Sequence, residues 1–180
     1  MKTAFVPEFI TEDEARELRI LHLWGQDPQD KSRWSEEFGG VVIPKAARDE
    51  LREHPVMQRI VDYVRENHGP LVTLDAPSYC TTEVRASGHT LHDDRGISYT
   101  ESSTGGGHMT WCRHSVTVLI SPPDEFSGGE FYYDDASLHA PTPAEQYRAL
   151  CYHTSDVKHG VLPHTGRRIV LLAFMADRTE

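Results

Sequence analysis

Two histidines and an aspartate in the second half of the chain have the types and the spacing of a metal site. His92, Asp93 and Asp94 lie in a run that predicts a β-strand, Thr90–Asp94. Residues i and i+2 of a strand point to the same side, so His92 and Asp94 can aim at one point. A histidine and a carboxylate placed in this way are two of the three ligands of the facial triad that holds non-haem Fe(II). The competing interpretation is a solvated acidic edge of a loop, in which the spacing arises by chance.

A third histidine, His159, strengthens the metal interpretation. It is followed by Pro163, by Gly166 and by a pair of arginines that opens the apolar run IVLLAF. A strand, a tight turn and an antiparallel strand would bring His159 and an arginine about nine residues later into one cavity. There the guanidinium can grip a carboxylate in a bidentate pair while a metal holds the other end of the same molecule. An arginine at the start of a strand is otherwise usually solvated.

The elements that must position these residues divide into a helical first part and a strand-rich second part. Three helices are expected: one begins at the capping box of Thr11 with Glu14 and ends at Gly25, and the others cover Lys45–Glu53 and Val56–Asn67. Short runs rich in Val, Thr, Tyr and Ile follow, which predict strands. The expected strands are Leu71–Leu74, Ser78–Arg85, Thr90–Asp94, Cys112–Ser121, Gly129–Tyr133, Gln146–His153, Val157–Val161 and Arg168–Met175. So many short strands favour a sandwich or a barrel-like double sheet.

Length and composition fit one soluble domain, with residues 1–70 as helical support and 71–176 as the β core. The chain has 180 residues and a formal net charge of −10, which argues against a nucleic-acid or anionic-membrane partner. No apolar run approaches the roughly 20 residues that a membrane helix needs. The acidic N-terminal segment is unlike a secretory signal, and three widely spaced cysteines fit a reducing compartment. A cytoplasmic location is therefore expected.

Taken together, the motifs resemble those of the iron- and 2-oxoglutarate-dependent dioxygenases, in their prolyl hydroxylase-like branch. Members carry H-x-D, then R-x-x-T-x-x-x-Y-L-x, then a G-G-E turn, then H-G-V-x-P and a basic residue. The matching segments here are His92–Asp94, Ser115–Ser121, Ser127–Phe131 and His159–Pro163, followed by Arg168. The resemblance implies a mainly β fold with N-terminal helices around a double-stranded β-helix, a jelly-roll or cupin-like core.

The resemblance also implies which residues bind the metal and the co-substrate. The Fe(II) ligands would be His92, Asp94 and His159. Arg168 would bind the distal carboxylate of 2-oxoglutarate. The residues that line the co-substrate pocket from the opposing strand would be Thr117 and Leu119.

Arg167 competes with Arg168 for the carboxylate. Alternation along a strand favours Arg168, because it then shares a face with Val170 and Leu172. A register shift of one residue would reverse the choice.

The chain departs from the family pattern around the co-substrate. The family often has a tyrosine on the strand before H-x-D, but the comparable position here is near Arg85, and Tyr79 is a distant candidate. Ser121 replaces the tyrosine of the R-x-x-T strand, and His114 stands in place of its arginine. The pocket is therefore partly rebuilt, and a different 2-oxo acid stays open as an alternative.

The expected activity is hydroxylation of an unactivated C–H bond, with release of succinate and CO2 and with ascorbate as a candidate reductant. Asp94 stands where related halogenases have a small residue, which favours hydroxylation over halogenation. The resemblance suggests an amino acid or a small biosynthetic intermediate as substrate. A small molecule is favoured over a protein, because the chain is only a little longer than the catalytic core. The alternative is a non-redox cupin-like metal protein, a small-ligand sensor or isomerase, in which the arginine grip has no obvious purpose.

Two neighbouring features complete the candidate site. The segment from Gly96 to Met109 contains Gly105–Gly107 beside His108, and a long loop inside a compact domain often has a function, here as a lid over the substrate. His89 lies three residues before His92 and is expected to face the other way on a strand.

Overall fold

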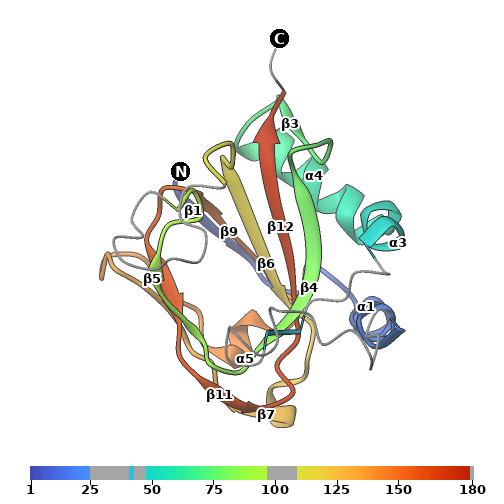
Figure 1. Cartoon of the computed structure of the whole chain (residues 1–180), viewed down its shortest axis with the longest axis vertical. Helices are drawn as coiled ribbons and strands as arrows, with labels where there is room; N and C mark the ends of the chain where they lie inside the picture. Colours follow the sequence, from blue (N-terminus) through green and yellow to red (C-terminus); the bar gives the residue numbers. More distant parts are fainter. Residues whose placement is uncertain (25–40, 43–47, 97–108, 179–180) are drawn as a thin grey trace.

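A larger β-sheet and a set of smaller strands that curve round opposite it form the centre of the molecule (Figure 1). The computed structural model describes residues 1–24, 41–42, 48–96 and 109–178. The larger sheet has the order β1 (Thr3–Val6), β9 (Leu150–Thr154), β6 (His114–Leu119), β12 (Val170–Asp177), β4 (Tyr79–Arg85) and β2 (Val41–Val42), with β3 (Val72–Thr73) paired to β12. One smaller sheet consists of β5 (His89–His92), β10 (His159–Val161) and β8 (Phe131–Tyr133), and another of β11 (His164–Gly166) and β7 (Phe126–Gly128).

Strand alternation gives the larger sheet two different faces. On β12, Leu171 and Ala173 are fully buried in the main apolar core, which also contains the apolar residues of the helices. Val170 and Leu172 point the other way and pack with Phe126 of the smaller strands. The two faces of one strand therefore serve different purposes: one binds the helices, and the other lines the space between the sheets.

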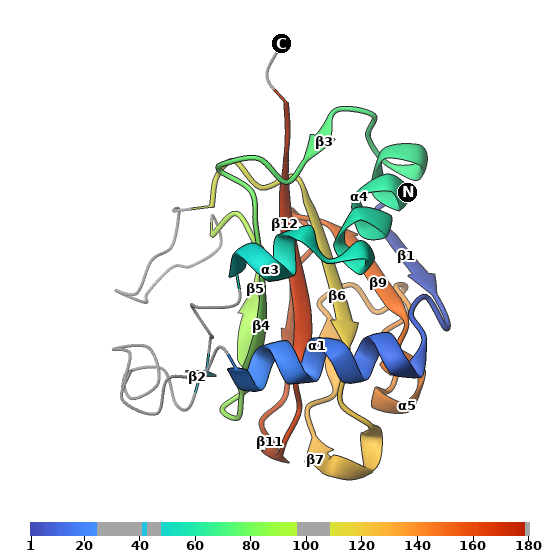
Figure 2. The same ribbon diagram turned by 90° about the vertical axis from the view of Figure 1, so that its right-hand side faces the viewer.

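The helices cover the outer face of the larger sheet, as Figure 2 shows. They are α1 (Glu12–Trp24), α3 (Arg48–Glu53) and α4 (Pro55–Asn67). Val56, Ile60 and Val64 of α4 are fully buried, as their spacing predicts. A short α5 (Pro143–Gln146) precedes β9, and a 3₁₀ turn (Pro123–Glu125) lies between β6 and β7.

The predicted capping box at the start of α1 is present. The Thr11 side chain accepts from the backbone N–H of Glu14, and the Glu14 carboxylate accepts from the backbone N–H of Thr11. Arg59 of α4 donates to both oxygens of the same carboxylate, at 2.5 and 2.9 Å. This bidentate pair lowers the pKa of Glu14 to about 2, against the opposing effect of partial burial. The capping residue of α1 thereby also joins two helices.

The expected mainly β fold with N-terminal helices is confirmed, with differences at the element ends. The strand predicted over Thr90–Asp94 ends at His92, and the predicted start of the Gln146–His153 strand lies in α5 instead. The N-terminal part is more than a helical support, because β1 pairs with β9 at the edge of the larger sheet. The first residues of the helix expected over Lys45–Glu53 lie outside the described part of the chain.

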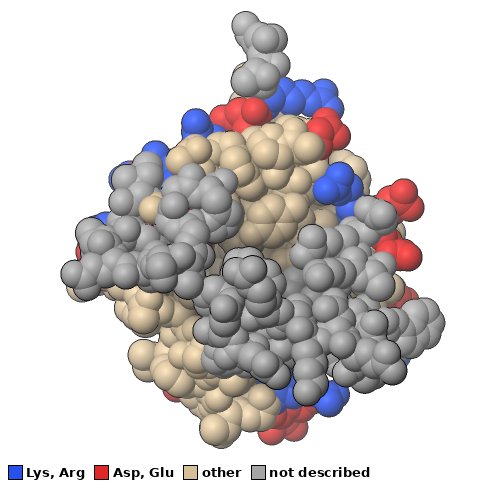
Figure 3. Space-filling model, viewed as in Figure 1, with Lys and Arg blue, Asp and Glu red and all other residues tan. Residues whose placement is uncertain are grey.

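The described side chains show the expected chemistry of a water-exposed exterior and an apolar interior. Acidic and basic groups of both signs lie around the edge of the face shown in Figure 3. The cysteines at positions 80, 112 and 151 form no disulfide bond and are buried. Within the described residues, each helix is too short or too polar to cross a membrane.

Candidate metal centre and co-substrate pocket

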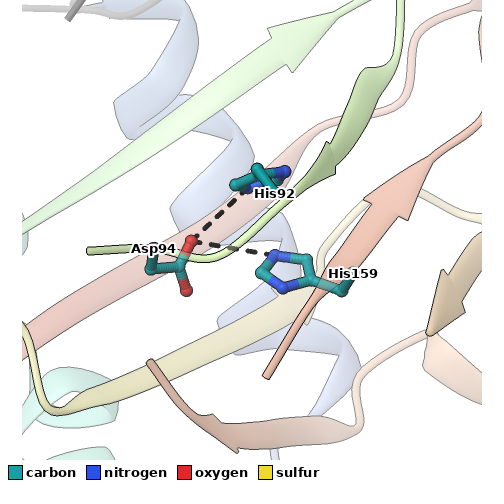
Figure 4. Close-up of side chains that lie close together, drawn as sticks. All are labelled: His92, Asp94 and His159. Atoms are coloured by element: carbon teal, nitrogen blue, oxygen red, sulfur yellow. Dashed lines mark ion pairs between the residues drawn. The ribbon is translucent and has the colours of Figure 1, made fainter. Parts of the chain in front are cut away.

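The pairing of β5 with β10 brings His92 and His159 together. The strands are antiparallel, and the two histidines stand directly opposite each other in the ladder. Asp94 follows β5 in a turn, where its backbone N–H donates to the carbonyl of Ser155 at 3.1 Å. Figure 4 shows the three side chains converging from these two segments. Asp94 lies beside His92 as expected. Strand alternation is not the cause, because β5 ends at His92 and a turn positions the aspartate.

The three side chains offer donor atoms to one point. The Nε2 atoms of His92 and His159 lie 3.5 and 3.7 Å from Oδ1 of Asp94. One possible ligand atom from each residue lies within 4.8 Å of the others, and all three residues are buried. Two neutral imidazoles and a carboxylate are the donor set that suits non-haem Fe(II). The structure thus brings together all three residues that the sequence suggested as ligands.

Backbone carbonyls orient both imidazoles. Nδ1 of His92 lies 2.7 Å from the carbonyl oxygen of Thr90, and Nδ1 of His159 lies 3.0 Å from that of Val157. A carbonyl oxygen can only accept, so each Nδ1 carries a hydrogen, and Nε2 is the atom left to bind a metal. This second contact fixes the tautomer that metal ligation requires.

Charge and burial act in opposite directions at this site. Burial alone would raise the pKa of Asp94, but the rings of His159, His92 and His153 lower it below the usual range of a carboxyl group. Burial lowers the pKa of His159 to about 3. The carboxylate is thus ionised and the imidazole neutral at physiological pH. Oδ2 of Asp94 is buried without a hydrogen-bond partner. A divalent cation would satisfy these atoms, so the residues present fit one.

His89 lies against His92, contrary to the expectation that it faces away. The Nδ1 atoms of the two rings are 2.6 Å apart, and the ring centroids are 3.6 Å apart in an edge-on arrangement. The ladder between β5 and β10 shifts its register between these two residues, so strict alternation does not apply. His89 thus contacts the Nδ1 side of the His92 ring, and Nε2 on the other side faces Asp94.

Of the two candidate arginines, the structure buries Arg168 and leaves Arg167 exposed. Arg168 Nη2 donates to Oε1 of Gln146 at 3.4 Å, and its Nε has no hydrogen-bond partner. Burial lowers the pKa of Arg168 to about 10, so the group stays charged at neutral pH. A buried guanidinium with an unpaired N–H has the chemistry to bind a carboxylate.

Arg168 lines a pocket together with His89, the residue that contacts the candidate ligand His92. The pocket walls include Glu83, Arg85, His89 and Val170. Because His89 touches His92, the arginine and the metal candidates belong to adjoining parts of one site. Arg85 stands near the position of the missing tyrosine, with its Nε 3.8 Å from Oε1 of Glu83.

The opposing strand contributes the two expected lining residues to the same face. Leu119 is the ladder partner of Val170, and Thr117 is the partner of Leu172. Ladder partners point to the same side of a sheet. Thr117 and Leu119 therefore face the space between the sheets, as does Leu172. That these residues contact a co-substrate stays a prediction.

The residues of the G-G-E turn have a steric role. A Cβ on Gly129 would lie 2.5 Å from Cδ of Arg168, and its φ of +76° is a conformation that L side chains rarely adopt. Glycine suits both the positive φ and the close approach of the arginine side chain at this point.

His114 and Ser121, which differ from the family pattern, make contacts that support the fold. Tyr79, the distant candidate for the family's tyrosine, packs among aromatic residues. His114 lies on the outer face of β6 and contacts the Tyr152 hydroxyl. Ser121 accepts from the backbone of Ile169. Tyr79 packs against Phe174 and Trp111. The possible lid residues, Gly105–Gly107 and His108, lie outside the described residues.

Sequence reasoning missed His153, Glu83 and Gln146 at this site. His153 is buried on β9, with its Nε2 3.6 Å from Oδ2 of Asp94. It follows Cys151 by two residues, so alternation on β9 would have placed both on one face. The sequence does not show whether this face of β9 points to the helices or to the smaller strands. The register of β9 against β6 decides that.

Comparison with known proteins identifies the fold. No family model and no curated protein matches the sequence. A prolyl-4-hydroxylase from Pseudomonas putida superposes with a TM-score of 0.67 and 16% identity, covering 99% of this chain and 94% of that one. EvdO2 from Micromonospora carbonacea, solved with 2-oxoglutarate, gives 0.60 and 15%, with 99% and 88% covered. The chain has the fold of the prolyl hydroxylase-like 2-oxoglutarate oxygenases.

The same fold supports more than one reaction. SnoN, described as a non-haem α-ketoglutarate-dependent epimerase from nogalamycin biosynthesis, superposes with a TM-score of 0.60 and 13% identity, covering 99% of this chain and 79% of that one. The predicted double-stranded β-helix is thus confirmed. The reaction has to be argued from the site itself.

Proposed function

We propose that this protein is an Fe(II)- and 2-oxoglutarate-dependent oxygenase. The observation that carries the proposal is the combination of His92, Asp94 and His159 at one point with the buried guanidinium of Arg168 in an adjoining pocket. A non-redox metal protein of the cupin type would need the first feature only. In this proposal the metal binds the 2-oxo acid end of a dicarboxylic acid, and Arg168 binds its distal carboxylate.

Each residue has a separate task in this proposal. His92, Asp94 and His159 would hold Fe(II), which together with 2-oxoglutarate supplies an oxidant for unactivated C–H bonds. Arg168 binds the distal carboxylate, and Gln146 orients its guanidinium. The side chains of Thr117 and Leu119 shape the pocket between these ends. Burial of the whole cluster excludes water from the reacting groups.

We further propose hydroxylation as the outcome, with succinate and CO2 as co-products. A carboxylate ligand at position 94 occupies the place that a halide would need. The proposed substrate is an amino acid or a small biosynthetic intermediate, and a small molecule is favoured over a protein. The occurrence of this fold in an enzyme from nogalamycin biosynthesis supports that choice. Ascorbate as reductant, a cytoplasmic location and the lack of nucleic-acid or membrane partners stay predictions.

The test is a measurement of succinate formed from 2-oxoglutarate by the iron-loaded protein. It is run with pools of amino acids and small intermediates, with ascorbate present, and products are screened for a gain of 16 Da. Succinate formation that depends on both iron and substrate supports the proposal. Asp94→Ala serves as the control, because it removes a candidate ligand.

Two results would redirect the assignment. Iron binding without any binding or turnover of 2-oxoglutarate would favour the non-redox sensor or isomerase. Succinate formation with an unchanged substrate mass would favour a reaction such as epimerisation over hydroxylation.

A further inference from the structure

The pocket that holds Arg168 is lined by a second guanidinium. Arg85, the last residue of β4, lines it together with Arg168, Glu83 and the apolar Val170. The ladder between β4 and β12 ends at the pair of Glu83 with Val170, and Arg85 and Arg168 lie two residues beyond that pair on the two chain segments. The two arginines therefore reach one pocket from neighbouring segments.

Both guanidiniums have N–H groups to spare. Nε of Arg85 and Nε of Arg168 are buried, and neither makes a hydrogen bond to a described residue. Nε of Arg85 lies 3.8 Å from Oε1 of Glu83, which is an ion-pair distance and too long for a hydrogen bond. Buried N–H groups without a partner cost free energy. A ligand that accepts from both arginines would remove this cost.

The charges of the pocket favour an anion. Arginine stays protonated in proteins, so Arg85 and Arg168 contribute two positive charges. Burial raises the pKa of Glu83, and the two guanidiniums lower it. Ionised or protonated, Glu83 balances at most one of the arginines. A carboxylate can accept from both guanidiniums at once, because each of its oxygens has two lone pairs.

We propose that Arg85 is a second anchor for the distal carboxylate of the co-substrate, beside Arg168, and that it makes the pocket specific for a 2-oxo dicarboxylic acid. This inference rests on the proposed function and adds a specificity-determining residue to it. A 2-oxo acid without a distal carboxylate would leave two buried guanidiniums without an acceptor, and unpaired polar groups of a site reject such analogues strongly. Glu83 keeps the Arg85 guanidinium at the pocket wall through their ion pair.

Two 2-oxo acids of equal chain length test the second anchor. 2-Oxopentanoate has a methyl group where 2-oxoglutarate has its distal carboxylate. Titration calorimetry on the Co(II)-loaded protein without oxygen measures both dissociation constants in the absence of turnover. In Arg85→Gln we expect the Kd for 2-oxoglutarate to rise by roughly tenfold or more, because a charge-assisted pair is lost. The Kd for 2-oxopentanoate should stay unchanged.

Two further variants control the experiment. Arg85→Lys should restore part of the affinity for 2-oxoglutarate, because it keeps the charge and loses the fork. Arg167→Gln changes an exposed arginine of the same region, so it should alter neither Kd. If Arg85→Gln does not fold, the same pair of Kd values in Arg85→Lys and Arg85→Met decides.

The contrary outcomes are distinct. An equal loss of affinity for both acids in Arg85→Gln would show that Arg85 only shapes the pocket, and no loss for either acid would remove it from the site. Either result overturns the proposal. Failure of the unchanged protein to bind 2-oxoglutarate at all would instead overturn the proposed function, which the succinate measurement tests separately.

Discussion

Each candidate metal ligand makes a hydrogen bond to a backbone carbonyl, through the ring of each histidine and through the main chain of the aspartate. The carbonyls of Thr90 and Val157 fix the rings of His92 and His159, and the carbonyl of Ser155 fixes the backbone of Asp94. The carbonyls that contact the two rings lie two residues before each histidine in the chain. The carbonyl that contacts Asp94 comes from the segment before β10, so the site also depends on how these two segments meet.

Removing one ligand should abolish metal-dependent turnover. We expect His92→Ala, Asp94→Ala and His159→Ala each to lower iron affinity by at least tenfold, because one of the donors is lost and the others lose their common point. Chelator competition measures the affinity. His164→Ala is the control and should bind iron normally. Full activity in any of the three ligand variants would remove that residue from the site.

Arg168 makes a prediction about the co-substrate. Breaking a buried charge-assisted pair costs roughly 2–5 kcal/mol, so Arg168→Ala should raise the apparent KM for 2-oxoglutarate by about 30-fold or more. Lys at this position should rescue in part, because it keeps the charge and loses the fork. Succinate release at varied 2-oxoglutarate concentration measures the effect.

The neighbouring arginine is the matched control for this experiment. Arg167 is exposed, so Arg167→Ala should leave the KM unchanged. A large effect at position 167 with none at position 168 would contradict the proposed anchor. An effect at neither position would place the anchor elsewhere.

At the scale of elements, the turn after β7 limits the space around the side chain of Arg168. Gly129→Ala would place a methyl group 2.5 Å from Cδ of Arg168, at a backbone φ of +76°. We expect a loss of stability of more than about 1 kcal/mol and a raised KM for 2-oxoglutarate. Thermal unfolding and succinate kinetics measure the two effects. Iron affinity should not change, and a loss of iron binding in place of the KM effect would contradict this steric role.

The pair between α1 and α4 predicts a pH dependence of stability. Arg59 lowers the pKa of Glu14 from 4.5 to about 2, so the native state favours the ionised form. This contribution is fully present above pH 4.5 and is lost as the pH falls through about 2. Glu14→Gln should cost about 1–2 kcal/mol at pH 7 and less near pH 2. Denaturant unfolding at both values measures the difference. An equal cost at both pH values would exclude the ion pair as the cause.

The sequence predicted elements with strong periodicity and missed those that tertiary contacts define. Val56, Ile60 and Val64 marked α4 correctly, because helix spacing is a local property. β1, β7 and β11 were missed: each is short, and pairing with a distant strand makes it a strand. His153 was missed for the same reason, since only the register of β9 against β6 shows which way it points.

At the scale of the whole molecule, the two layers have a division of labour. The helices bury the outer face of the larger sheet, and the smaller strands close over its inner face, where His153, Thr117 and Leu119 lie. β5 and β10 bring together ligand candidates that are distant in sequence. Each candidate alone had a competing structural explanation, and the ordered set of motifs made the three-residue site predictable.

Because the candidate ligands come from β5, the turn after it and β10, metal binding should stabilise the fold as a whole. A ligand that binds only the native state adds about 2.7 kcal/mol at 100 times its Kd. For a domain of this size that raises Tm by about 5–10 °C. Differential scanning fluorimetry with and without Co(II) measures the shift, and chelator should reverse it. Asp94→Ala should lose the shift, because the carboxylate that joins the rings is gone. A full shift in Asp94→Ala would show that the cation stabilises the protein from another site.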